Sequence, residues 1–147
     1  MVEMVISLED ETMLGTLKNI LKSFSGIANI TVHKKEKVRQ EVYDRMVFRL
    51  DELAGLQANW DDDGALPIEK KVVSNVRKFL DKSQDVDLKD WAMFPDVNGT
   101  ILLENQSGSV VSIGNLEFSY TSSNGNGRGI KYSPSSLLKT IRAINGK

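Results

Sequence analysis

Residues 94–104, FPDVNGTILLE, carry the strongest hairpin signal in the chain. The dipeptide Asn98-Gly99 favours a tight two-residue turn, and extended apolar segments stand on both sides of it. Beyond it apolar residues alternate again, with an apparent slip at Gly114 that predicts a β-bulge. The alternating residues are Val111, Ile113, Leu116, Phe118, Tyr120, Ile130 and Tyr132. We therefore expect an antiparallel meander of three to four strands.

Helical patterns flank the predicted meander. Upstream, apolar residues spaced by three and four positions predict one helix from about residue 34 to 56 and a second from Pro67 to about Lys82. Downstream, Ser133 and Pro134 are typical of a capped helix start and predict a terminal helix. The glycine-rich run at residues 122–129 is expected to be a flexible hairpin tip. The predicted fold class is α+β, with the helices on one face of the sheet.

The first 34 residues carry a separate strand-helix-strand pattern. Residues 4–8 and 28–32 alternate as strands do, and apolar residues between them keep a helical spacing, with Gly26 placed to end the helix. Two strands and one helix bury too little apolar surface to be stable alone. We therefore expect residues 1–34 to be a dimerisation or docking unit, which packs on a second copy or on the α+β module of residues 35–147.

Composition restricts the function classes. The chain has 147 residues, 40% of them hydrophobic, and 19 basic against 20 acidic residues, so no overall charge attracts nucleic acid or a membrane surface. Cysteine is absent and His33 is the only histidine, which removes thiolate chemistry and multi-histidine metal sites. The N-terminus lacks the pattern of a secretory signal, so we expect a cytoplasmic protein without a membrane segment or a cofactor.

Residues 59–67, NWDDDGALP, form the candidate site. Consecutive carboxylates at Asp61, Asp62 and Asp63 suggest a metal, but calcium loops alternate their ligands. The structural alternative is a corner between two helices, in which an aspartate accepts backbone N–H groups, Gly64 supplies a permissive dihedral angle and Trp60 fills the joint.

Two further sets of charged residues suggest functional sites. A carboxylate of the 61–63 cluster could act with Asp96 or Glu104 in a metal-dependent hydrolase. From residue 121 onward the chain has five basic residues and no acidic one, which favours an anionic partner such as nucleic acid. These basic residues are Arg128, Lys131, Lys139, Arg142 and Lys147. The arginines of the 34–56 pattern, Arg45 and Arg49 among them, are expected on a solvated helix face that forms ion pairs.

The pattern N-W-D-x-x-G-A-x-P at residues 59–67, followed by P-x-x-x-G-x-I-x-L-E at residues 95–104, resembles a set of small uncharacterised bacterial proteins. The resemblance covers about residues 45–120 and implies a compact module without an established activity. The strand-helix-strand pattern of residues 1–34 also looks like the short dimerising segments that precede some bacterial antitoxins.

Three functions follow as hypotheses. The first is a non-catalytic protein-interaction module, antitoxin-like or immunity-like, that acts as a homodimer through residues 1–34 and binds a protein partner. The second is a metal-dependent hydrolase centred on Asp61, Asp62 and Asp63. The third is a nucleic-acid-binding protein that uses the basic C-terminal residues.

Overall fold

The computed structural model describes residues 4, 6, 8, 11–27 and 35–146, and the chain divides into two compact units, residues 1–34 and 35–147. The first unit contains a 3-10 turn, η1 (Glu11–Met13), that continues into helix α1 (Leu14–Lys22). The predicted helix is therefore present. It ends at Lys22, and its C-cap residue is Ser23 and not the predicted Gly26. The strand predicted at 28–32, and residues 5 and 7 of the one predicted at 4–8, lie outside the described residues.

The second unit is an α+β module with three helices and a five-stranded antiparallel sheet. Its sheet order is β1-β2-β3-β4-β5, so every strand pairs with its neighbour in sequence. The elements are α2 (Lys35–Ala54), α3 (Lys70–Asp81), β1 (Trp91–Pro95), β2 (Ile101–Asn105), β3 (Val110–Ile113), β4 (Glu117–Ser122), β5 (Gly125–Lys131) and α4 (Pro134–Asn145). The fold class is confirmed, and the meander has five strands rather than three to four.

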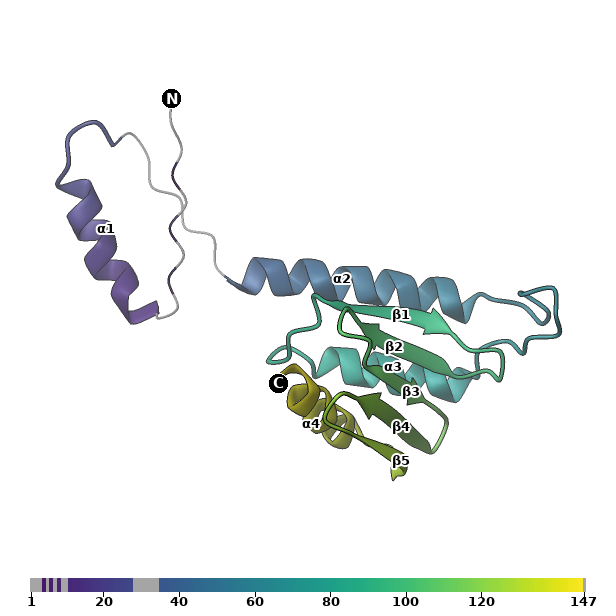
Figure 1. Cartoon of the computed structure of the whole chain (residues 1–147). Helices are drawn as coiled ribbons and strands as arrows, with labels where there is room; N and C mark the ends of the chain where they lie inside the picture. Colours follow the sequence, from purple (N-terminus) through teal and green to yellow (C-terminus); the bar gives the residue numbers. More distant parts are fainter. Residues whose placement is uncertain (1–3, 5, 7, 9–10, 28–34, 147) are drawn as a thin grey trace. The chain divides into compact units, whose positions relative to one another are not determined.

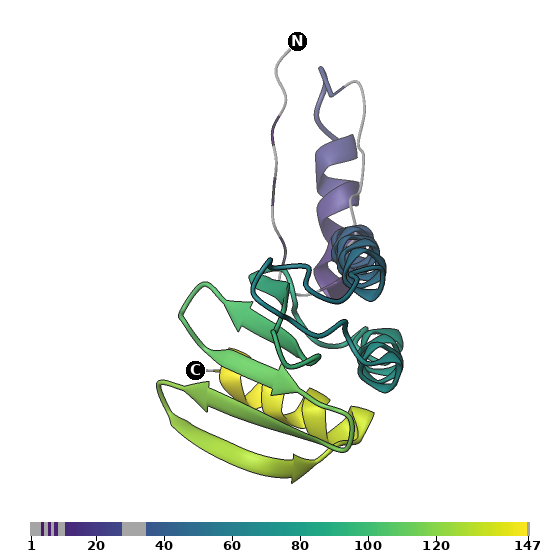
Figure 2. The same cartoon turned by 90° about the vertical axis from the view of Figure 1, so that its right-hand side faces the viewer.

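The helices α2, α3 and α4 lie on one face of this sheet, as the two views in Figures 1 and 2 show. The buried strand residues all point to that face, and the largest of them is Trp91. The shared core is formed by Met46, Leu50, Leu53, Val72, Val76, Phe79, Leu80, Trp91, Met93, Ile101, Leu103, Val111, Ile113, Phe118, Leu137 and Ile141, among others. Within residues 35–146, no helix covers the opposite face of the sheet. None of the described helices is both long and apolar enough to cross a membrane.

The β1–β2 connection is a hairpin, but its loop is longer than the predicted two residues. The Asp96 N–H donates to the Thr100 carbonyl at 3.0 Å, and the Gly99 N–H donates to the Asp96 carbonyl at 3.1 Å. Gly99 has a φ of 88°, so the loop combines a four-residue turn with a left-handed residue at its end. The glycine is required at the last loop position and not as half of a two-residue turn.

The predicted bulge at Gly114 is wrong. Gly114 lies in the tight turn between β3 and β4, where its N–H donates to the Glu117 carbonyl at 2.9 Å. The slip in alternation is therefore a change of strand, and Leu116 in that turn is 76% exposed. The irregularity of the sheet lies instead between Phe118 and Tyr120, in the pairing of β4 with β5.

The glycine-rich run is a strand and not a flexible tip. The hairpin turn is confined to Ser123 and Asn124, and β5 already begins at Gly125. Gly127 lies under the ring of Tyr120, because a Cβ atom added there would be 2.6 Å from Tyr120 Cε1. The Tyr120 ring thus packs on the β5 backbone, where the glycines have no side chains of their own. This contact explains how a sequence with poor strand propensity forms an edge strand.

A polar cluster joins α3 to the sheet and to the start of α4. The buried Asn75 side chain donates to the Gly114 carbonyl at 3.0 Å and to the Asn115 carbonyl at 2.9 Å. The Tyr132 hydroxyl donates to the backbone carbonyl of Asn75, and burial raises the pKa of Tyr132 to about 12. The next residue, Ser133, caps α4 as predicted, since its hydroxyl accepts the Ser136 N–H at 3.0 Å. These hydrogen bonds hold α3 against the β3–β4 turn and against the residues before α4. None of the bonded groups is charged.

Candidate functional site

The 59–67 segment is a tightly hydrogen-bonded loop. Asp61 Oδ1 accepts the N–H groups of Asp63 and Ala65, both at 2.9 Å, and Asn59 Oδ1 accepts the Gly64 N–H at 2.7 Å. These bonds, first of all that from Ala65, lower the pKa of Asp61. Gly64 has a φ of 88°, so the predicted roles of the aspartate and the glycine in the turn are both confirmed.

The predicted role of Trp60 as the plug between two helices is wrong. Trp60 is half-buried and does not belong to the core or to the side chains packed against it. Its indole N–H donates to the Leu66 carbonyl at 2.9 Å, so the ring stabilises its own loop. Helix α3 begins only at Lys70, after Pro67 and the N-cap residue Glu69, and the proline is therefore outside the first helical turn.

The loop is instead attached to the β1–β2 hairpin. The Leu66 N–H donates to the Val97 carbonyl at 2.8 Å, and the Glu69 N–H donates to the Gly99 carbonyl at 3.0 Å. A Cβ atom at Gly99 would be 3.0 Å from the Pro67 carbonyl oxygen. The two segments of the sequence pattern, 59–67 and 95–104, therefore meet in space and hold each other's backbone.

The carboxylates predicted as a hydrolase centre are exposed or accept hydrogen bonds from nearby backbone N–H groups. Asp62 and Asp63 are exposed, and Asp96 Oδ1 accepts the N–H of its neighbour Val97 at 2.8 Å. Glu104 is exposed in β2, across the pair from Ala92. Among the described residues, no group of three or more histidine, cysteine, aspartate or glutamate side chains is placed to hold a metal ion.

The basic C-terminal residues are distributed over two elements. Arg128 and Lys131 belong to β5, and Lys139 and Arg142 belong to α4. All four are exposed, and none forms an ion pair with any other residue that the structure describes. Lys147 lies outside the described residues. Their positive charges are therefore accessible from solvent, as an anionic partner would require, although Lys131 is paired across the sheet with Glu117.

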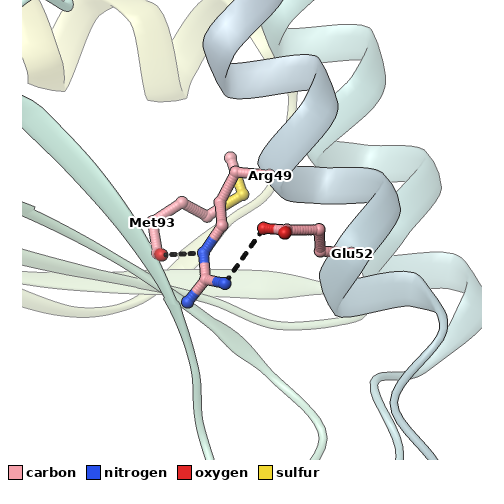
Figure 3. Close-up of polar contacts among 3 residues, drawn as sticks. All are labelled: Arg49, Glu52 and Met93. Carbon is pink, nitrogen blue, oxygen red and sulfur yellow. Dashed lines mark hydrogen bonds and ion pairs between the residues drawn. The ribbon is translucent and has the colours of Figure 1, made fainter.

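Two arginines of α2 close the outer edge of β1. Arg45 is exposed and Arg49 forms an ion pair with Glu52, as the expectation of a solvated helix face with ion pairs requires, but both guanidinium groups also bind backbone carbonyls, which was not expected. Arg45 donates to the carbonyls of Trp91, Leu88 and Lys89 at 3.2, 3.4 and 3.3 Å. Arg49 Nε donates to the Met93 carbonyl at 3.0 Å, and its Nη1 forms an ion pair with Glu52 at 3.2 Å (Figure 3). Because the carbonyls of Trp91 and Met93 face away from β2, the guanidinium groups occupy acceptors of β1 that would otherwise pair with another strand.

A groove accompanies these arginines between α2 and β1. It is a cavity of about 270 Å³ whose walls are lined by Arg45, Met46, Phe48, Arg49, Glu52, Ala92, Met93 and Phe94. Phe48 is 67% exposed and Phe94 is 42% exposed, although both are large apolar side chains. We refer to these eight residues as the α2–β1 groove.

The sequence contained a weak signal for this groove. Phe48 falls off the apolar stripe of its helix, and Phe94 alternates with the buried residues Trp91 and Met93 of its strand, so each was identifiable as outward-facing. The proximity of Phe48 to Phe94 was not identifiable from the sequence, because it depends on how α2 crosses β1.

No family model, no curated protein and no solved structure matches this chain. The resemblance of residues 45–120 to small bacterial proteins therefore stays a prediction.

Acidification is expected to lower stability through Asp61. Since the pKa of Asp61 is lowered on folding, its carboxylate stabilises the fold above the pKa of the unfolded chain, about 3.9, and this contribution disappears as the pH falls through the folded pKa. Urea unfolding between pH 5 and pH 2.5 should show a smaller pH dependence for Asp61→Asn than for the original chain.

Asp62→Asn is the matched control for this experiment. Asp62 has a φ of 62°, which asparagine tolerates, and its carboxylate is exposed. This variant should keep the full pH dependence. If Asp61→Asn and Asp62→Asn change the slope equally, the hydrogen bonds of Asp61 do not stabilise the loop through its charge.

Proposed function

We propose that this chain is a non-catalytic protein-interaction module that assembles as a homodimer through its N-terminal unit and binds a protein partner, as antitoxins and immunity proteins do. The observation that supports the dimer is the lack of buried side chains in α1. This nine-residue helix has no buried residue, although Leu14, Leu17, Ile20 and Leu21 form an apolar stripe along it. A helix of this length is marginal in water without tertiary packing.

A second copy would provide a matching surface for this stripe. Two identical apolar stripes related by a two-fold axis are self-complementary, and dimers of this symmetry are the commonest oligomers. Ile20 is 50% exposed and belongs to the stripe, so it gains most from such pairing. The basic residues Lys18 and Lys22 of the same helix are spaced so that they can remain in solvent beside it.

Light scattering on the full chain tests the dimer. We expect a dimer at micromolar concentration for the original chain and a monomer for Ile20→Asp, because a carboxylate in the paired stripe is costly to desolvate. Leu116→Asp is the matched control, since Leu116 is exposed in the β3–β4 turn of the second unit, and it should remain dimeric. A monomeric original chain, or a dimeric Ile20→Asp variant, would contradict the proposal.

The partner is tested separately. When the full chain is purified from its native cells, it should retain one protein partner in a fixed stoichiometry. Mass spectrometry then identifies that partner. Recovery of nucleic acid in place of protein, in amounts that fall steeply with salt, would favour the basic C-terminal residues as the binding surface instead.

A further inference from the structure

The composition of the α2–β1 groove is that of a protein interface. Six of its eight lining residues are phenylalanine, methionine or arginine, the types enriched where proteins bind one another. The volume of about 270 Å³ is below the roughly 300–1,000 Å³ typical of small-molecule sites. A cavity of this size accommodates one or two side chains of another protein and not a whole cofactor.

The two arginines give the groove a fixed positive charge. Their guanidinium groups are anchored by backbone carbonyls, so little side-chain freedom remains to be lost on binding. Glu52 balances only Arg49, and among the residues described in the second unit Arg45 has no acidic partner. Arg49 Nη2 donates no hydrogen bond within the described chain. The groove therefore offers donors to a carboxylate beside two exposed phenyl rings.

The closed edge of β1 restricts the shape of the occupant. Added strands bind an edge through its free carbonyl and N–H groups, but the outward carbonyls of Trp91 and Met93 are occupied by the arginines. The occupant must then bind through its side chains. A helix meets this requirement, because residues three or four positions apart project from the same face.

We propose that the α2–β1 groove binds an amphipathic helix of a protein partner that presents an apolar side chain and, one turn away, a carboxylate. The apolar side chain lies between Phe48 and Phe94, and the carboxylate accepts hydrogen bonds from Arg49 Nη2 and from the Arg45 guanidinium. This inference rests on the proposed role as a protein-interaction module and names the surface and the chemistry of its partner.

The test uses a phage-displayed library of single helices with randomised surface positions, selected against the biotinylated full-length chain. We expect enriched clones to share an apolar residue with aspartate or glutamate three or four positions away. A synthetic peptide of the enriched sequence should bind Phe48→Ser about tenfold more weakly in fluorescence anisotropy. Replacing the peptide's acidic residue by lysine should weaken binding to the original chain about tenfold, without any change in the protein.

Leu116→Ser is the matched control, since it removes an exposed leucine from the turn after β3, and it should bind the peptide like the original chain. Phe48 is 67% exposed, so its replacement is not expected to disturb folding, and far-UV circular dichroism of the variant verifies this. Enriched clones that are basic, or that bind Phe48→Ser unchanged, would overturn the proposal.

Self-association is a further outcome that the same variants separate. If the original chain dimerises and Phe48→Ser abolishes the dimer, a second copy fills the groove and the helical partner is refuted. If the chain is monomeric and still binds the acidic peptide through Phe48, the groove proposal stands and the dimer of the N-terminal unit fails.

Discussion

Trp91→Ala is expected to lower the free energy of unfolding by about 3–5 kcal/mol, which is the usual cost of truncating a buried large aromatic residue. Trp91 is 2% exposed and is the largest buried side chain in the described core. Its indole N–H also donates to Asn145 Oδ1 at 2.9 Å, so the substitution removes a bond to the end of α4 as well as packing. Urea unfolding followed by circular dichroism measures the loss.

Trp60→Ala is the matched control, because the chain has two tryptophans in contrasting environments. Trp60 is half-buried and hydrogen-bonds only within its own loop, so we expect a loss of about 1 kcal/mol. Similar losses for the two substitutions would show that the 59–67 loop supports the core more than its contacts indicate.

Gly99→Ala is expected to cost about 2–4 kcal/mol, the second largest effect. Gly99 combines a φ of 88° with a close approach to a backbone atom, since an added Cβ would be 3.0 Å from the Pro67 carbonyl oxygen. An oxygen of the main chain cannot rotate away as a flexible side chain can. The substitution should therefore strain the hairpin and push it away from the 59–67 loop.

Gly108→Ala separates these two causes. Gly108 has a φ of 82° in the β2–β3 turn, but nothing lies within 4 Å of its added Cβ. It should cost only about 1–2 kcal/mol for the left-handed backbone. If the two variants unfold at the same urea concentration, the contact between Gly99 and Pro67 does not stabilise the module.

Elements with strong local signals were predictable from the sequence. The apolar spacing of α2 and the Ser133-Pro134 start of α4 identified both helices, because these signals are local in the chain. A short last strand was expected around Ile130 and Tyr132, but the glycine-rich part of β5 was missed, since its strand character comes from the Tyr120 ring over Gly127 and not from its own propensity. Tertiary contact overrode composition at this position.

The candidate site was predictable only in part. The hydrogen bonds of Asp61 and the left-handed Gly64 follow from turn chemistry within seven residues, and both were anticipated. The attachment of this loop to Val97 and Gly99 and the arginines over the β1 edge join segments at least 30 positions apart in sequence. Periodicity and spacing carry no information about such distant pairs.

The neighbour-to-neighbour order of the sheet has a kinetic consequence. Each strand pairing closes a short loop, which costs little chain entropy, whereas the Arg45–Trp91 contact spans 46 residues and the Tyr132–Asn75 contact spans 57. We expect the hairpins to form early in folding and the helices to dock on them later. The α2–β1 groove would then be among the last features completed, so that a chain still folding could not yet engage its partner.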